Sequence, residues 1–270
     1  MKRKLKKAGT HIILIIASVV SVFPLYWMIA AATNNSTDVL GGKLSLGLNF
    51  FNNLTKLTSM QNVGRVFGNS LLFSTILSLL SLLVCSIAGY GFEIYHDKAK
   101  DRLMNILLLA MMVPFAATMI PLFKLFSGMK LTSTWIAYVL PTISTPFLIM
   151  LFRQSARSFP MEIIEAARID GLSEFKIFLT MFMPTMKSTY AAALTVTFMN
   201  AWNNYLWPKV IMTSETAQTM PMLVANLSVG YSIDYGVLML GVLICSLPTG
   251  ILFLVLQKSF ANGIVGAVKG

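Results

Sequence analysis

The chain has 270 residues, of which 56% are hydrophobic and only 11% are charged, and its mean hydropathy is +0.73. These values exclude a soluble domain with a charged surface and indicate an integral membrane protein. The net charge of +11 does not indicate nucleic-acid binding, because the basic residues are spread over the ends of apolar segments rather than gathered on a basic helix. Attraction to anionic lipid headgroups explains the charge more simply.

Six apolar segments are long enough to cross a membrane as helices, namely 11–33, 69–94, 103–128, 133–153, 188–208 and 237–258. We therefore expect an all-α integral membrane protein with six transmembrane helices. A single transmembrane domain, 11–258, would lie between a basic N-terminus, 1–10, and a tail, 259–270. The first span also resembles a cleaved secretory signal, but its apolar run exceeds the usual length of about 7–15 residues, which favours a retained span.

The distribution of lysine and arginine predicts the orientation of the chain. With the N-terminus inside, 15 of the 21 basic residues fall in cytoplasmic segments or at inner span ends. This is the bias of the positive-inside rule. It places both termini and the loop 154–187 in the cytoplasm, and the loop 209–236 on the outer side.

All ten acidic residues lie in loops or at span ends. Proton- and ion-driven carriers usually keep a carboxylate within the membrane, so its absence argues against an ion-coupled secondary transporter, although sodium sites built from carbonyl groups stay open. The chain also lacks the Gly-x-x-x-x-Gly-Lys-Ser/Thr loop that cradles phosphates. If the chain takes part in transport, it is a non-catalytic subunit that binds no cofactor, and another subunit supplies the energy.

The loop between the fourth and fifth spans predicts a helix-turn-helix. Pro160 suits the first turn of a helix over 161–169, and Gly171 can adopt the left-handed conformation that ends it. Ser173 can then cap a second helix that runs to Pro184. We expect two short helices that meet at a glycine hinge.

The first of these helices has an apolar side formed by Ile163, Ile164 and Ala167. The small side chains of Ala166 and Ala167 would let the helix lie close against a groove in a partner protein. An amphipathic helix that rests on the lipid surface has the same periodicity. The periodicity alone does not separate these alternatives.

The amino-acid sequence of the loop favours the docking helix over the lipid-bound one. Glu165-Ala166-Ala167-x-x-x-Gly171, followed after nine residues by Met181-Phe182-Met183-Pro184, resembles the EAA loop of the permease subunits of ATP-binding-cassette (ABC) importers. Over roughly residues 65–270 the chain is similar to the maltose-type carbohydrate permeases. The motifs that carry this similarity are Met112-Val-Pro114, Ile120-Pro121-Leu-Phe123, Leu140-Pro141, Phe152-Arg153-Gln154, Asn203-x-Tyr-Leu-Trp-Pro208, Thr219-Met-Pro221 and Gly266-Ala-Val-Lys-Gly270.

The resemblance implies a type I ABC-importer permease in the plasma membrane of a bacterium. A homologous second permease would complete the pore, a dimer of ATPase subunits would bind ATP and Mg, and an extracytoplasmic binding protein would deliver a sugar or oligosaccharide. The residues implied in coupling to the ATPase are Glu165, Ala166, Ala167, Asp170 and Gly171, with Glu165 as the polar contact and Gly171 as the hinge. The alternatives are a permease for a non-sugar solute, an ion-coupled transporter, and a membrane scaffold or sensor.

The resemblance also assigns roles to two further segments. Thr219, Met220 and Pro221 belong to the outer loop that would reach the binding protein, although the sequence alone would describe a surface loop. The terminal 266–270 segment resembles a tail that reaches toward the ATPase dimer, with a disordered end as the alternative.

The fifth span carries the most polar surface inside the membrane. Thr197, Asn200 and Asn204 recur at i, i+3 and i+7, and Asn203 and Trp207 lie nearby. Such side chains could line the translocation path, because amides can bond sugar hydroxyls and an indole offers an aromatic face. Asparagines inside a membrane also join helices to one another, and this alternative stays open.

Overall fold

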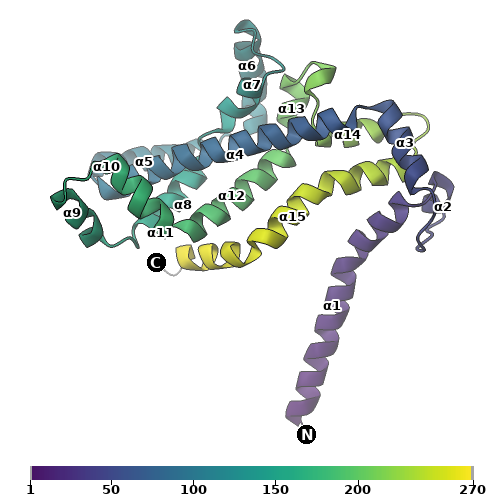
Figure 1. Cartoon of the computed structure of the whole chain (residues 1–270), viewed down its shortest axis with the longest axis horizontal. Helices are drawn as coiled ribbons and strands as arrows, with labels where there is room; N and C mark the ends of the chain where they lie inside the picture. The colour runs from purple at the N-terminus through teal and green to yellow at the C-terminus, as the bar shows by residue number, and fades with distance from the viewer. Residues whose placement is uncertain (1, 269–270) are drawn as a thin grey trace. The chain divides into compact units, whose positions relative to one another are not determined.

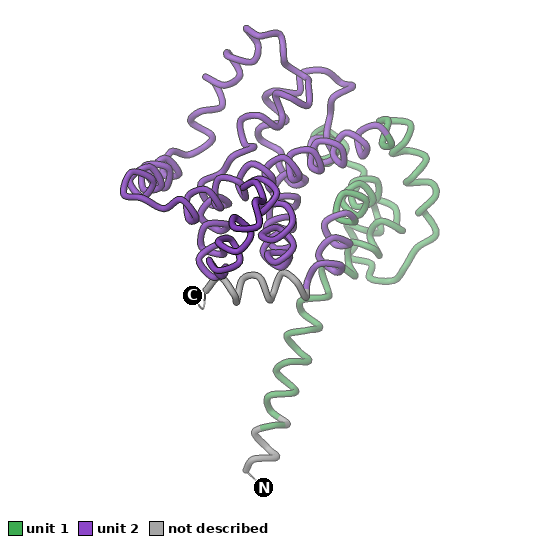
Figure 2. Tube along the Cα trace, turned by 60° about the vertical axis from the view of Figure 1, so that its left-hand side comes forward, with its two compact units in different colours: residues 1–64, 223–247 green, residues 65–222, 248–270 purple. Residues whose placement is uncertain are grey.

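The computed structural model describes the backbone of residues 2–268 and the side chains of Lys7 and of residues 9–257. Every regular element in that part of the chain is helical (Figure 1), which confirms the predicted all-α class. The chain divides into two compact units (Figure 2). Unit 1 comprises residues 1–64 and 223–247, and unit 2 comprises residues 65–222 and 248–270.

Unit 1 contains the helices α1 (Lys2–Ala32), α2 (Ser36–Leu40), α3 (Phe50–Met60) and the first part of α15 (Tyr235–Val268). A buried amide joins them, since the Asn53 side chain donates to the carbonyl oxygens of Ala32 and Asn34, both at 2.9 Å. Gly236 packs against this junction, where an added Cβ would lie 2.3 Å from the Asn34 oxygen. Only glycine fits at that position, because no real Cβ approaches an oxygen so closely.

Unit 2 holds most of the remaining elements. They are α4 (Val63–Ile94), α5 (Lys98–Ala110), α6 (Phe115–Gly128), α7 (Trp135–Val139), α8 (Pro146–Ala156), α9 (Met161–Ile169), α10 (Glu174–Ile177), α11 (Met183–Thr185), α12 (Lys187–Trp202), α13 (Leu206–Ile211) and α14 (Met220–Leu227), which crosses into unit 1. In Figure 1, α9 and α10 lie near the C-terminal end of α4. The buried residues of α6, α7 and α13 pack instead against Phe73 and Leu77, in the N-terminal half of α4.

The predicted spans differ in how continuous they are. Within the described residues, three helical segments are long and apolar enough to cross a membrane, Gly9–Ala32, Val63–Ile94 and Tyr235–Gln257. Two helix pairs reach that length only together and are bent, α5 with α6 by 94° and the segment Trp135–Thr142 with α8 by 55°. The α12 helix has 16 residues, fewer than the roughly 20 that a straight span needs. The structure thus supports three to five spans, and the helices predicted over 103–128, 133–153 and 188–208 are each interrupted.

Proline and capping chemistry explain two of these interruptions. Pro114 disfavours the helical conformation at Val113 and cannot donate a backbone hydrogen bond, so α5 ends before it and α6 begins after it. Pro146 starts α8, and the hydroxyl of Thr145 accepts from the Leu148 amide at 3.4 Å. Apolar length alone does not reveal such breaks.

The helices α4 and α8 approach each other closely at Gly89. A Cβ at this position would lie 2.6 Å from the Cβ of Phe152 and 2.7 Å from the amide nitrogen of Arg153. Small residues permit such backbone contact between membrane helices. This contact fixes α8 along α4 and positions the charged side chains of α8 described below.

Candidate functional site

The predicted helix-turn-helix is present, with α9 over Met161–Ile169 and Gly171 at φ +77°. Two hydrogen bonds of 3.0 Å close the turn, from the Gly171 amide to the Arg168 oxygen and from the Leu172 amide to the Ala167 oxygen. This pair of bonds defines a Schellman motif. Ser173 directly precedes α10 as predicted, but its side chain makes no capping hydrogen bond there. The second helix continues beyond α10 as a π-helical segment, Phe178–Phe182, and ends with α11.

The two sides of α9 have different surroundings. Ile164 and Ala167 are 0% and 2% exposed and pack into a cluster with Tyr90 and the aromatic residues of the π-helical segment. The exposed side carries Glu162, Glu165, Ala166 and Ile169. Ala166 and Ala167, which we expected to share a docking surface, therefore face different surroundings. Asp170 and Gly171 are exposed at the end of the helix.

Aromatic rings join the loop to the C-terminal end of α4. The Tyr90 ring lies 4.9 Å from the Phe182 ring and 5.4 Å from the Phe178 ring, centroid to centroid, in edge-on geometry. Phe178 and Phe182 stack on each other at 5.6 Å. Edge-on and stacked aromatic pairs stabilise a core beyond the area that they bury. A displacement of this loop would therefore act on α4.

An ion pair also joins α9 to α10 across the Gly171 turn. The Arg168 Nε lies 2.6 Å from Glu174 Oε1, and the Arg168 guanidinium lies 5.8 Å from the centre of the Tyr95 ring. The hydrogen bond from Arg168, followed by that from Tyr95, holds the pKa of the Glu174 carboxyl below its ordinary value of 4.5. Glu174 is thus an anion at neutral pH and pairs α10 with α9.

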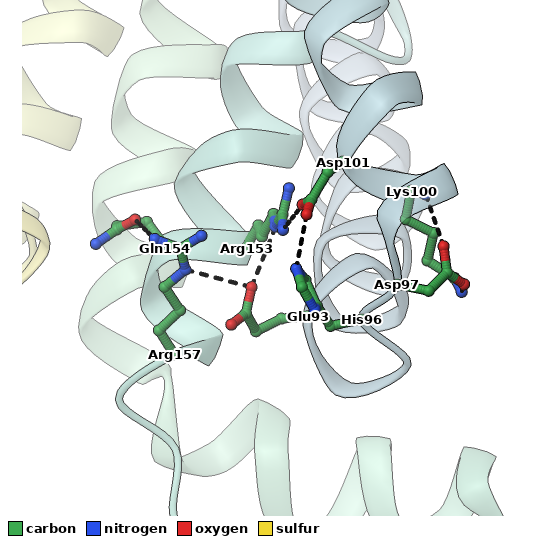
Figure 3. Close-up of polar contacts among 8 residues, drawn as sticks. All are labelled: Glu93, His96, Asp97, Lys100, Asp101, Arg153, Gln154 and Arg157. Atoms are coloured by element: carbon green, nitrogen blue, oxygen red, sulfur yellow. Dashed lines mark hydrogen bonds and ion pairs between the residues drawn. The ribbon is translucent and has the colours of Figure 1, made fainter.

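A second group of charges joins α4, α5 and α8 (Figure 3). Arg153 is 4% exposed, and its guanidinium contacts Glu93 Oε2 at 3.1 Å and Asp101 Oδ1 at 2.6 Å. Arg157 approaches the same Glu93 oxygen at 3.3 Å, and His96 contacts Asp101 at 2.9 Å. The sequence indicated Arg153 as a motif residue and as one of the inner basic residues, but it did not reveal this cluster. An arginine in an apolar helix is itself a signal, because it requires nearby carboxylates.

A cavity of about 200 Å³ lies between α12, α8 and the segment before α8. Three residues predicted to line a translocation path, Thr197, Asn200 and Asn204, form part of its wall. The other lining residues are Leu77, Thr142, Thr145, Phe147, Leu148, Val196 and Ala201. The hydroxyl oxygen of Thr197 is buried and has no hydrogen-bond partner in the structure. The cavity can therefore offer hydroxyl and amide groups to a polar ligand.

The other two residues predicted for this path lie elsewhere. Asn203 is exposed and does not line the cavity. Trp207 is 1% exposed, its Nε1 donates to the Ala137 oxygen at 3.0 Å, and its ring packs edge-on against Phe115 and Phe126. The chain leaves the helical conformation between α12 and α13, which turns the indole into the core. The aromatic ring that lines the cavity is that of Phe147, half exposed on α8.

The outer loop also differs from its expected arrangement. Thr219 and Met220 are buried, and the Met220 amide donates to the Ser70 hydroxyl at 2.7 Å. Pro221 is half-buried. The exposed part of the loop contains Glu215 and Thr216 instead. The Met220 amide thus fixes this part of the loop to α4, and the exposed Glu215 and Thr216 offer polar groups beside it.

Two further observations concern the chain end and possible metal ligands. Of the predicted tail, Lys269 and Gly270 lie outside the described residues, as do all side chains beyond Gln257. Within the described part, no group of three or more His, Cys, Asp or Glu side chains could hold a metal ion.

The helical fold and the candidate spans define a multi-pass membrane protein, and an exposed helix-turn-helix lies between two of its span regions. Residues 94–265 match the family described as "Binding-protein-dependent transport system inner membrane component". The chain belongs to this family. This confirms the predicted class, an inner-membrane permease component of an ABC importer and a membrane subunit rather than an enzyme.

Two relatives cover nearly the whole chain. The lactose transport system permease protein LacG of Rhizobium radiobacter is 40% identical over 269 residues, which are 100% of this chain and 98% of that protein. The arabinooligosaccharides transport system permease protein AraQ of Halalkalibacterium halodurans is 35% identical over 257 residues, covering 93% of this chain and 92% of that protein.

A solved structure supports the fold. It is a crystal structure of a bacterial ABC transporter involved in the import of the acidic polysaccharide alginate, and one of its chains superposes with a TM-score of 0.85 at 17% identity. The match covers 96% of this chain and 98% of that chain. The same arrangement of helices therefore occurs in an ABC importer.

Proposed function

We propose that this permease forms, with a homologous second permease, the translocation path for a sugar or oligosaccharide. The names of the two relatives above support this substrate class, because they refer to lactose and to arabinooligosaccharides. A more distant relative, at 25% identity, is the sn-glycerol-3-phosphate transport system permease protein UgpE of Escherichia coli. A phosphorylated polyol is therefore the alternative substrate, at lower similarity.

We infer a type I importer fold with six spans and both termini in the cytoplasm. The bent pairs α5–α6 and α7–α8 would each count as one span, and α12 would cross together with α13. The predominance of basic residues in the segments assigned to the cytoplasm supports this orientation. Broken helices are tolerated in a membrane where they are buried in protein or line a cavity.

The exposed face of α9 is the observation that carries the proposal. Glu165 and Ala166 lie outward, while Ile164 and Ala167 hold the helix on its own subunit. The buried face of this short helix packs on its own subunit, and the exposed face presents a small residue and a carboxylate. Such an exposed face suits a groove in a partner protein. We assign that groove to an ATPase dimer, which would supply the binding sites for ATP and Mg.

Two other surfaces have roles in the same proposal. The cavity between α8 and α12 would contribute to the translocation path through Asn200, Thr197 and the Phe147 ring. The exposed segment of the outer loop with Glu215 and Thr216 would meet the extracytoplasmic binding protein. The buried Thr219 and Met220, with the half-buried Pro221, would hold that segment in place.

Reconstitution tests the proposal. The chain would be purified with its co-expressed second permease and ATPase, placed in proteoliposomes, and supplied with the binding protein and a labelled ligand. We expect ATP-dependent uptake of lactose or an arabino-oligosaccharide, and none with an ATPase variant that cannot hydrolyse ATP. Preferential uptake of sn-glycerol-3-phosphate would favour the alternative substrate. Uptake without any ATPase, or an intact complex that lacks one, would overturn the proposal.

A further inference from the structure

We propose that Arg168, Glu174 and Tyr95 form a clamp that makes α9 and α10 one rigid body. The Gly171 turn then keeps its conformation during transport, and movement of α9 passes directly to the C-terminal end of α4. This inference rests on the proposed function, since it concerns how the coupling loop transmits an ATPase movement. It replaces the expectation that the two helices hinge at Gly171.

The backbone of the turn is already closed. The Gly171 and Leu172 amides donate back to the last turn of α9, each at 3.0 Å. Leu172 also packs in the same cluster as Ala167, which is the hydrophobic contact that accompanies a Schellman motif. The φ of +77° at Gly171 satisfies a fixed helix stop. Opening this turn would break both hydrogen bonds and separate the apolar contact.

One cation joins the three segments that meet at the turn. Arg168 lies in the last turn of α9, its partner Glu174 is the first residue of α10, and Tyr95 follows directly after α4. The separation of 2.6 Å between Arg168 Nε and Glu174 Oε1 is that of a short charge-assisted hydrogen bond. The guanidinium also lies within cation–π range of the Tyr95 ring. A rotation at Gly171 would break these contacts together.

The aromatic cluster that contains Tyr90 would transmit a movement of α9 to α4. Ile164 and Ala167 from α9 share a cluster with Tyr90 of α4 and with Phe178 and Phe182. Because these side chains are closely packed in one cluster, we expect a shift of α9 to displace the Tyr90 ring. The clamp on one side and this core on the other hold α9 against α4, and Arg168, Glu174 and Tyr95 act as positioning residues.

Cross-linking α9 to α10 across the turn distinguishes a rigid loop from one that hinges at Gly171. In the complete reconstituted importer, Arg168→Cys with Glu174→Cys would be joined by a short bifunctional thiol reagent. Because this variant lacks the native ion pair, we expect the cross-link to raise its uptake per ATP hydrolysed toward that of the wild type. Each single-cysteine variant, treated with the same reagent, controls for Cys85 and Cys245. Loss of uptake in the cross-linked double variant alone would overturn the clamp and restore the hinge.

Charge variants give a second, independent measurement, the number of ligands taken up per ATP hydrolysed. We expect Glu174→Ala to lower this ratio by about 2- to 30-fold, the range of mutations that change coupling. The exchange Arg168→Glu with Glu174→Arg should restore it, whereas Lys176→Ala, exposed on the same helix, should leave it unchanged. Wild-type protein that binds no ATPase would contradict the proposed function itself. If the wild type couples ATP hydrolysis to uptake and Glu174→Ala shows the same number of ligands per ATP, only the clamp would be contradicted.

Discussion

Arg153 and Asp101 are 52 residues apart in the chain, yet Nη2 of the arginine lies 2.6 Å from Oδ1 of the aspartate. Glu93 supplies a second carboxylate to the same guanidinium. The cation of α8 is thus paired with anions from the end of α4 and the start of α5. A nearly buried arginine is tolerated there because both carboxylates accompany it.

This arrangement predicts a large cost when the partners of Arg153 are removed. Glu93→Gln with Asp101→Asn should lower the free energy of unfolding clearly, since it leaves the nearly buried guanidinium unpaired. Adding Arg153→Met should recover most of that loss. Arg157 is half exposed, so Arg157→Ala should cost less than about 1 kcal/mol. Unfolding in detergent micelles would measure all four proteins, and equal stability of the double and triple variants would contradict the explanation.

The close approach of α4 to α8 predicts different results for two neighbouring glycines. Gly89→Ala should lower the free energy of unfolding by about 1–3 kcal/mol, because the new methyl group would push against the backbone of α8. Gly91→Ala meets nothing within 4 Å and should be neutral or slightly stabilising, since alanine favours a helix over glycine. Thermal unfolding of the two single variants checks this. Similar destabilisation by both would show that glycine propensity, not helix contact, decides the result.

Ala166 and Ala167 give a matched pair on the coupling loop. Ala167→Leu should overpack the core below α9 and expose the loop to proteolysis, with a cost of about 1–3 kcal/mol. Ala166→Leu should leave stability unchanged and reduce the amount of ATPase that co-purifies, because its side chain lies on the exposed face. Protease digestion and pull-down of the ATPase would distinguish the two effects. Normal ATPase binding by Ala166→Leu would remove this face from the proposed contact.

The helix-turn-helix loop was predicted more accurately than the spans. The reason is that the signals for the loop are local in the sequence, whereas the breaks in the spans depend on more than apolar length. Helix start, glycine stop and second helix depend on neighbours within a few residues, and the structure has α9 and the Gly171 turn where those signals place them. Apolar periodicity did not show whether the inner side of α9 meets its own subunit or a partner. Apolar length likewise did not show the break before Pro114, since a broken span and a straight span have the same composition.

Contacts between distant segments account for the remaining differences. No local pattern pairs Arg153 with Asp101, and none shows that Trp207 donates to the Ala137 oxygen, 70 residues away. The Trp207 indole was assigned to a polar stripe as if α12 continued through it. The break after Trp202 puts it on another helix, and Phe147 takes its place at the cavity.

The junction of unit 1 predicts a dependence on pH. Burial raises the pKa of Asp234, but the Lys56 ammonium, the Val237 amide and the Ser36 hydroxyl outweigh it and bring that pKa below its ordinary value of 3.8. The carboxylate therefore contributes stability that is fully present above pH 3.8 and is lost as the pH falls through the lowered pKa. The unfolding temperature of wild type should exceed that of Asp234→Asn near neutral pH, and the difference should shrink below pH 3.8. A difference that stays constant with pH would show that the hydrogen bonds, not the charge, matter.

The cavity offers the most direct test of a role for this subunit in the translocation path. Asn200 lines it and neighbouring Asn203 does not, although both are exposed asparagines. Asn200→Ala should slow ligand uptake by about 2- to 10-fold, the effect of losing one hydrogen bond, without reducing ATPase binding. Asn203→Ala should transport as wild type does. Phe147→Ala should also slow uptake, because the ligand would lose an aromatic face. Equal uptake by all three variants, measured with the same reconstituted importer, would assign the ligand contacts to the second permease.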